Sequence, residues 1–298
     1  MQAGAKPPFG WSGKAACDIV RSGKHGREQR QMGIDMWSLQ FLIEARNRIG
    51  SFGSLLQIGR QELHISKNDH PMADRYLHEG GVGLTYRQAT RGGSYADEGL
   101  FQSLGATDVA AADASAYEGA VLVHDFNDPI EVRWHQRYDT VFDGGSLEHI
   151  FNVPTTLANE MNLVRVGGHI LSAVPSNNWL GHGFYQFSPE LPYRVFTPNN
   201  GFRMECAFLT EMTGDHSLYL VEDLARRAGG EIGCTNTNTN LQFIATKTAH
   251  ILPFRRWPQQ GDYQNAWDEF ASNEAALPVD VPASPVAARR SVFQKLFG

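Results

Sequence analysis

The stretch from residue 138 to residue 175 constrains the fold more than any other part of the sequence. The apolar run at 138–143 ends in a glycine turn, a helix with Pro154 in its first turn follows, and residues 169–175 are again apolar. A strand, a helix and a strand of these lengths form a βαβ crossover, which is right-handed in nearly every protein. The chain is therefore predicted to contain a parallel sheet with helices on its faces.

Shorter apolar segments extend this pattern on both sides. The spacing of apolar residues predicts a helix over 34–49. Further strands are predicted at 54–58, before Gly59, at 108–113, at 121–125, at 204–211 and at 240–246, with a helix over 218–228. Alternating strands and helices indicate an α/β fold with a doubly wound, mostly parallel sheet.

Composition divides the chain into three regions. Residues 1–33 are polar and are predicted to form a flexible arm, and residues 34–252 form the α/β domain, with an irregular insertion at 60–94 that has a single helical turn. Residues 253–298 are predicted to form a proline-rich wrap that ends in a short amphipathic helix over 287–298. Its basic residues could touch a membrane surface, but packing on its own domain or in a homodimer is favoured.

Net charge and cysteine content limit the binding partners and the cellular compartment that are expected. A net charge of −6 gives no basic face for phosphates, so no nucleic-acid partner is expected. No apolar stretch is long enough to span a bilayer, and residues 1–13 lack the apolar core of a signal peptide. Three cysteines far apart in the sequence fit a reducing compartment, so a cytoplasmic protein is expected.

Several predicted strands end on residues that suit a nucleoside ligand. Ligands of parallel sheets bind beyond the carboxyl ends of the strands. Gly59, Asp113, Asp125 and Asp143 stand at four such ends. A carboxylate there can accept hydrogen bonds from ribose hydroxyls, and a glycine lets the backbone approach closely. One acid at a strand end means little, because Asp begins many turns, but three in succession favour a nucleoside site.

The segment 138–171 resembles the fourth-strand to fifth-strand block of class I S-adenosylmethionine-dependent methyltransferases. It carries Tyr138-Asp139-Thr140-Val141-Phe142-Asp143, then Leu147-Glu148-His149-Ile150, then Leu163-Val164-Arg165-Val166-Gly167-Gly168-His169-Ile170-Leu171. The resemblance covers about residues 53–250 and implies the Rossmann-like fold of that family and S-adenosylmethionine as cofactor. The cofactor-binding residues that it implies are Gly59, Arg60, Gln61, Asp113, Ala114, Asp125, Phe126, Asp143 and Gly144.

The turn after the first strand departs from the family pattern. The family has Gly-x-Gly-x-Gly there, whereas this chain has Gly59-Arg60-Gln61-Glu62-Leu63, with only the first glycine. Asp113 also lies much further along than the about 20 positions usual in nucleotide folds. The insertion at 60–94 accounts for the gap and is a candidate lid. The missing glycines disfavour a dinucleotide enzyme and leave a second interpretation open, a binding or assembly subunit without catalysis.

Candidate catalytic residues follow the fourth strand and candidate acceptor residues follow the fifth. His149 is the preferred base, with Glu148 and His182 as further candidates, because a neutral imidazole suits proton transfer near pH 7. The loop at 176–191 follows the fifth strand, where acceptor loops lie in this fold. The stretch Gly181-His182-Gly183-Phe184-Tyr185-Gln186-Phe187-Ser188-Pro189-Glu190-Leu191-Pro192-Tyr193-Arg194-Val195 also resembles one found in bacterial methyltransferases associated with glycan and secondary-metabolite gene sets, with Pro192 as the one departure. The expected acceptor is a small molecule or a saccharide, methylated at oxygen, and the acceptor-binding candidates are Asn177, Trp179, His182, Tyr185 and Glu190.

No metal site is predicted from the sequence. The insertion contains His64, His70 and His78, but they have no acidic partner at a fixed spacing. They are expected to be surface residues.

Overall fold

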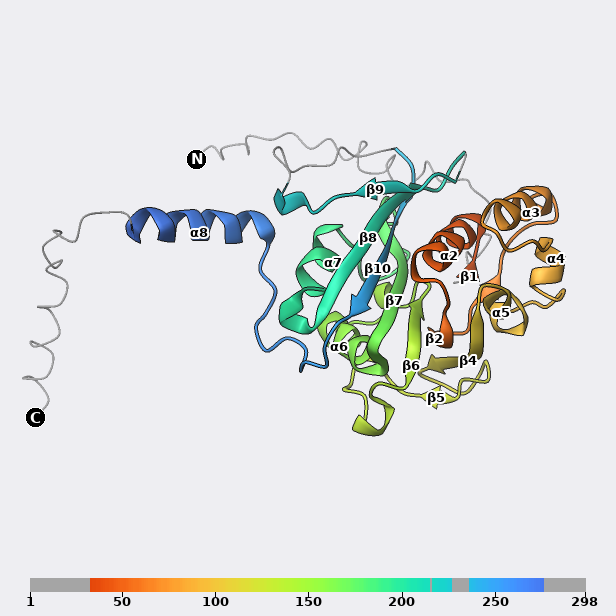
Figure 1. The fold of residues 1–298 in the computed structure, drawn as a ribbon, viewed down its shortest axis with the longest axis horizontal. Helices are drawn as coiled ribbons and strands as arrows, with labels where there is room; N and C mark the ends of the chain where they lie inside the picture. The colour runs from red at the N-terminus through yellow and green to blue at the C-terminus, as the bar shows by residue number, and fades with distance from the viewer. Residues whose placement is uncertain (1–32, 215, 227–235, 276–298) are drawn as a thin grey trace, which may run out of the picture. The chain divides into compact units, whose positions relative to one another are not determined.

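The computed structural model describes residues 33–214, 216–226 and 236–275. Its central feature is an eight-stranded mixed sheet (Figure 1). The strands, in spatial order, are β5 (Leu122–Val123), β4 (Ala106–Asp113), β2 (Gly53–Ile58), β6 (Tyr138–Asp143), β7 (Val164–Asn177), β10 (Thr239–Lys247), β8 (Phe202–Glu211) and β9 (Tyr219–Val221). The predicted α/β fold with a largely parallel sheet is confirmed.

The strand directions divide the sheet into two parts. Strands β5, β4, β2, β6 and β7 are parallel to their neighbours. Strand β10 is antiparallel to both β7 and β8, and β9 is antiparallel to β8. The crossover from β6 through α6 (Val153–Leu163) to β7 is the βαβ unit that the sequence predicted.

Two apolar cores lie on opposite faces of the sheet because successive side chains of a strand alternate. Leu55 and Phe142 pack with α2 (Met36–Ile49), α3 (His70–Glu79), α4 (Tyr86–Ala89) and α5 (Leu100–Ser103). The adjacent residues Leu56 and Val141 pack with α6 and α7 (Glu190–Val195) on the other face. Strands buried on both faces explain the continuous apolar runs from which they were predicted.

Three expectations from the sequence need correction. The insertion at 60–94 is not irregular: it contains β3 (Glu62–Leu63), paired with β1 (Gly33–Ile34), and the helices α3 and α4. Ala73 and Leu77 of α3 are fully buried, so the helix packs in the core and is not a loosely attached lid. Few of its residues are apolar, so the segment did not stand out as a helix in the sequence.

The other two corrections concern the last third of the chain. The expected helix over 218–228 is wrong at 219–221, which form β9 along the edge of β8. The expected wrap after residue 252 contains α8 (Gly261–Ala275), whose first backbone N–H donates to the carboxylate of Glu190 over 2.5 Å. The predicted N-terminal arm up to residue 32 and the C-terminal helix over 287–298 lie outside the described residues.

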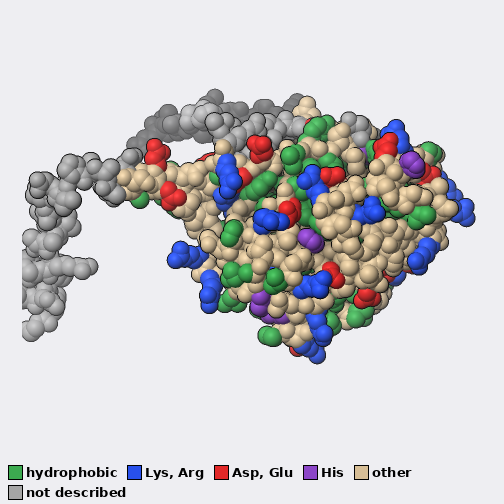
Figure 2. Space-filling view, viewed as in Figure 1, with side chains coloured by type: hydrophobic (Ala, Val, Ile, Leu, Met, Phe, Trp, Pro, Cys, Tyr) green, Lys and Arg blue, Asp and Glu red, His purple; other side chains and the backbone are tan. Residues whose placement is uncertain are grey.

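Surface chemistry adds two observations. On the face shown in Figure 2, lysine and arginine side chains are scattered among acidic ones and do not form a continuous basic patch. Among the described residues, no helix has the length and apolar character needed to cross a bilayer.

Candidate functional site

The carboxyl ends of the parallel strands bring the predicted strand-end residues to one edge of the sheet. Ile58 of β2 is paired with Ala112 of β4 on one side and with Asp143 of β6 on the other. The backbone N–H of Gly59 donates to the carbonyl of Ala112 over 2.7 Å, so Gly59 and Asp113 are close neighbours. The fold therefore brings Gly59, Asp113 and Asp143 to the same edge of the sheet.

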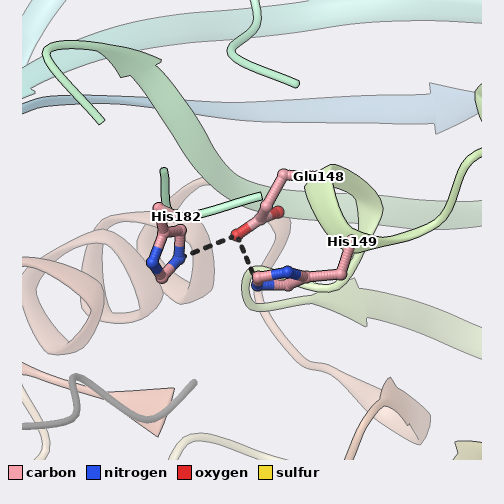
Figure 3. A group of neighbouring side chains, drawn as sticks. All are labelled: Glu148, His149 and His182. Atoms are coloured by element: carbon pink, nitrogen blue, oxygen red, sulfur yellow. Dashed lines mark ion pairs between the residues drawn. The ribbon is translucent and has the colours of Figure 1, made fainter. Parts of the chain in front are cut away.

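The three candidate catalytic side chains meet just beyond β6. Glu148 and His149 lie on the short 3-10 helix η3 (Leu147–His149), and His182 comes from the loop after β7. Nε2 of His182 lies 3.6 Å from Oε1 of Glu148, and Nε2 of His149 lies 3.8 Å from the same oxygen. Figure 3 shows the two rings on either side of the carboxylate, with both Nε2 atoms directed at it.

The environment of this group favours a neutral imidazole at His149, next to the buried acid Glu148. The side chain of Glu148 is only 1% exposed, whereas those of His149 and His182 are 37% and 25% exposed. Burial lowers the pKa of His149; the charge of Glu148 works against this shift, and His182 adds to it. An unprotonated imidazole at the surface of the site can accept a proton or bind a cation.

Backbone contacts hold Glu148 and His182 in place. The carbonyl of Glu148 accepts the N–H of Phe184 over 2.8 Å, and only the absence of a side chain at Gly183 permits the close approach of the two segments. The ring of Trp179 lies 5.0 Å from that of His182, and its Nε1 donates to the carbonyl of Thr239 over 3.1 Å. The acceptor loop is thus fixed to the sheet through Trp179.

The remaining acceptor candidates make different contacts. Asn177 ends β7, where its Cα partner is Thr239 of β10. Tyr185 donates its hydroxyl hydrogen to the carbonyl of Phe151 and belongs to an aromatic group around the loop. Glu190 instead accepts the N–H of Gly261 and forms an ion pair with an arginine one helical turn later, so its carboxylate serves the attachment of α8.

The resemblance implies that Asp143 binds the cofactor, whereas in the structure its side chain stabilises a turn. Its side chain is fully buried and accepts the backbone N–H groups of Gly145 (3.0 Å), Ser146 (2.6 Å) and Leu147 (3.1 Å). It therefore closes the turn that carries Glu148 and His149, and its carboxylate is not available to a cofactor. Gly144 follows it, and a side chain there would overlap that of Gln61.

A buried glutamate partners Asp143, and sequence reasoning missed it. Glu160, in the middle of α6, is 1% exposed and is hydrogen-bonded to Asp143. Burial and the charge of Asp143 raise the pKa of Glu160 well above its ordinary value, so Glu160 carries the proton. Burial and the charge of Glu148 also raise the pKa of Asp143. The acid was overlooked because a glutamate inside a helix is ordinarily a surface residue.

The turn after β2 is closed by side chains. Gln61 is fully buried, and its Nε2 donates to the carbonyls of Ile58 (3.2 Å) and Gly59 (3.0 Å). Gly59 has φ of 70°, a conformation that glycine adopts readily. Arg60 points elsewhere, forming an ion pair with Asp97 and lying over the ring of a nearby tyrosine. The glutamine thus stabilises a turn that has only one glycine.

The other cofactor candidates differ in exposure. Asp113 is half-buried and accepts the N–H of Ser115 over 3.0 Å, and Ala114 is exposed beside it. Asp125 is exposed, and hydrogen bonds from Asn127 lower its pKa. Phe126 is 4% exposed and packs in the core with α6, so its ring is not free to cover a ligand.

Comparison with known proteins gives only distant likenesses. No family model matches the chain, and no curated protein matches it. Among solved structures, the chain resembles 1,6-didemethyltoxoflavin-N1-methyltransferase of Burkholderia thailandensis, bound to 1,6-didemethyltoxoflavin and S-adenosylhomocysteine, with 16% identity over 82% of this chain and 94% of that one, at a TM-score of 0.38.

Two further structures are similarly distant. The trans-methyltransferase CalH, in complex with SAH, is 15% identical over 69% of this chain and 54% of that one, at a TM-score of 0.36. The 16S rRNA (adenine(1408)-N(1))-methyltransferase of Catenulisporales acidiphilia is 12% identical over 74% of this chain and 99% of that one, at a TM-score of 0.33. At these scores the likenesses support neither a fold nor an activity, which must follow from the chain's own residues.

Proposed function

We propose that this chain is an S-adenosylmethionine-dependent methyltransferase that acts on a hydroxyl group of a small molecule or a saccharide. The observation that carries the proposal is the shared position of two groups at one edge of the sheet. Gly59 and Asp113 lie at the ends of β2 and β4, and the Glu148, His149 and His182 side chains lie just beyond β6 and β7. A nucleoside site beside a proton-accepting site is what methyl transfer to oxygen requires.

The residues at the edge fit such a cofactor in part. Asp113 keeps a half-exposed carboxylate for ribose hydroxyls next to the tight turn at Gly59. The turn closed by Gln61 offers no phosphate cradle, and S-adenosylmethionine carries no phosphate. When bound, the cofactor supplies an already activated methyl group, so placement of the acceptor oxygen provides much of the acceleration.

The side chains of Glu148, His149 and His182 provide a group that can accept the proton of the acceptor hydroxyl. As the acceptor oxygen attacks the methyl carbon, the carbon–sulfur bond breaks, its electron pair stays on sulfur, and the hydroxyl proton must leave. His149 is held on η3 by the buried turn, and burial keeps its imidazole neutral. It takes the proton as a general base, and His182 on the acceptor loop orients the acceptor.

The rival function is a binding or assembly subunit of the same fold without catalysis. The burial of Asp143 and Phe126 favours it, because two residues that the resemblance assigned to the cofactor are engaged in the core. The three side chains at Glu148 favour the enzyme. Cofactor binding separates the two functions.

Wild-type protein is expected to bind S-adenosylhomocysteine with micromolar affinity, and Asp113→Ala is expected to weaken binding at least tenfold. The variant loses hydrogen bonds from the ribose hydroxyls to a charged acceptor, each contributing about 1.5–3 kcal/mol. Isothermal titration calorimetry measures both affinities.

Asp108→Ala is the matched control, because Asp108 lies near the opposite end of the same strand and is exposed. It should bind the ligand as wild type does. Absence of heat and of any thermal shift at millimolar ligand in wild type would refute the enzyme and leave the assembly subunit.

A further inference from the structure

We propose that Glu148, His149 and His182 bind a divalent transition-metal ion of the zinc class. Their three ligand atoms lie within 4.8 Å of one another, around one point at the surface end of the buried turn. Two imidazole nitrogens and one carboxylate oxygen are the protein ligands of many catalytic zinc sites, where the fourth position stays open for water or substrate.

The distances show that hydrogen bonding does not hold this group together. Charge-assisted N–H···O bonds are about 2.7–2.9 Å long. Both Nε2 atoms stop at 3.6 Å and 3.8 Å from Oε1 of Glu148, although they face it. Ligand atoms of a tetrahedral zinc ion at about 2.0–2.1 Å are separated by about 3.3 Å. Small movements of the two partly exposed rings would therefore place all three atoms on one ion.

The negative charge of the buried Glu148 side chain also favours the binding of a cation. Its side chain is 1% exposed, and among the described residues its Oε2 is buried without a hydrogen-bond partner. Within the same part of the chain, only the two imidazoles pair with it. A buried carboxylate without a compensating charge is costly, and a divalent ion bound through it removes that cost.

The surroundings keep the ligands in position for an ion. Glu148 is fixed through its carbonyl by the N–H of Phe184, and the turn beneath it is closed by Asp143. The ring of Trp179 packs against that of His182, and Trp179 is itself hydrogen-bonded to β10. A ligand set held by neighbouring groups loses little freedom when the ion arrives.

A metal ion here would deepen the proposed function, on which this consequence rests. The acceptor hydroxyl would occupy the open position, the ion would lower the pKa of that hydroxyl, and its proton would pass to water. The two imidazoles would then be ligands rather than bases. Metal binding itself needs neither the cofactor nor an acceptor and can be tested alone.

Zinc titration of the chelator-treated full-length protein tests the site. Wild type is expected to bind one equivalent of Zn²⁺, and His149→Ala and His182→Ala are each expected to lower its affinity by about 100-fold. Mg²⁺, which prefers oxygen ligands, should not compete. Co²⁺ offers a second readout, since its visible absorption bands should change in both variants.

The control variants distinguish zinc binding at this site from zinc binding at other histidines and from loss of binding through misfolding. His78→Ala removes an exposed imidazole on α3 and should bind zinc as wild type does. Glu148→Gln retains the size of the buried side chain and should weaken zinc binding even if an alanine variant fails to fold. No stoichiometric binding, or equal affinity in wild type and all three site variants, would overturn the proposal. The calorimetry with S-adenosylhomocysteine is independent, so either proposal can fail without the other.

Discussion

Replacing His149 by alanine is expected to lower methyl-transfer turnover by about 10²–10⁴-fold, the usual contribution of a general acid or base. Its imidazole lies at the surface of the site, 3.8 Å from Glu148, the other titratable side chain of η3, which is only 1% exposed. The affinity for S-adenosylhomocysteine should stay close to that of wild type. The measurement is the rate of S-adenosylhomocysteine formation at saturating acceptor, with binding followed by calorimetry.

His182→Ala serves as the comparison. His182 belongs to the acceptor loop, so the variant should mainly raise the apparent KM for the acceptor. If His182→Ala instead loses turnover while His149→Ala affects KM, the base is His182. Normal turnover in both variants would contradict a proton-transfer role for either residue and leave placement alone as the source of catalysis.

Asp143→Ala is expected to lower the free energy of unfolding by about 3–5 kcal/mol, because each buried polar group left without its hydrogen-bond partner costs about 1–3 kcal/mol. The change leaves three backbone N–H groups of the turn without their acceptor and leaves Glu160 buried without its partner. Urea denaturation measures the loss. Asp128→Ala, at an exposed position, should change stability by no more than about 0.5 kcal/mol.

The same pair predicts how stability depends on pH. The folded-state pKa of Glu160 is raised, so the folded chain holds a proton that the unfolded chain releases above about pH 4.5. The stability that this proton provides is complete below that pH and is lost as the pH rises toward the folded pKa, by at most about 1.4 kcal/mol per pH unit.

Glu160→Gln keeps a hydrogen-bond donor to Asp143 without a titrating proton. It should fold even if Asp143→Ala does not, and its stability should fall less than that of wild type between pH 5 and pH 8. Parallel pH dependence in wild type and Glu160→Gln would show that the pair shares no proton.

The sequence predicted those strands whose side chains are buried on both faces of the sheet. The strands β2 and β6 and the later part of β7 are buried on both faces and appear as apolar runs. Helix α3 was missed because only Ala73 and Leu77 are buried among polar neighbours, and β9 was mistaken for a helix because a three-residue edge strand has no period of its own. Pairing along an edge is set by the neighbouring strand.

The three candidate catalytic residues are brought together by the fold, which their positions in the sequence did not predict. Glu148, His149 and His182 were selected separately, for their places after two strands, and only the fold shows that they share one point. The sequence did not suggest the metal site proposed above, because ligand motifs are recognised by their spacing and His182 comes from a different loop. Asp143 and Phe126 resembled cofactor residues, but their burial depends on contacts with α6 that no local pattern encodes.

The order of the strands also has a consequence for how the chain reaches this structure. Strand β2 lies beside β6, and the hydroxyl of Thr140 donates to the carbonyl of Phe52, 88 residues earlier in the chain, over 2.8 Å. Pairings this distant in sequence slow folding because a long loop must close before they form. During synthesis, β2 and β4 emerge before β6, so the backbone N–H and C=O groups along one edge of β2 stay unpaired until residue 143 has left the ribosome. A truncation that ends before β6 would leave that edge open to association with other chains.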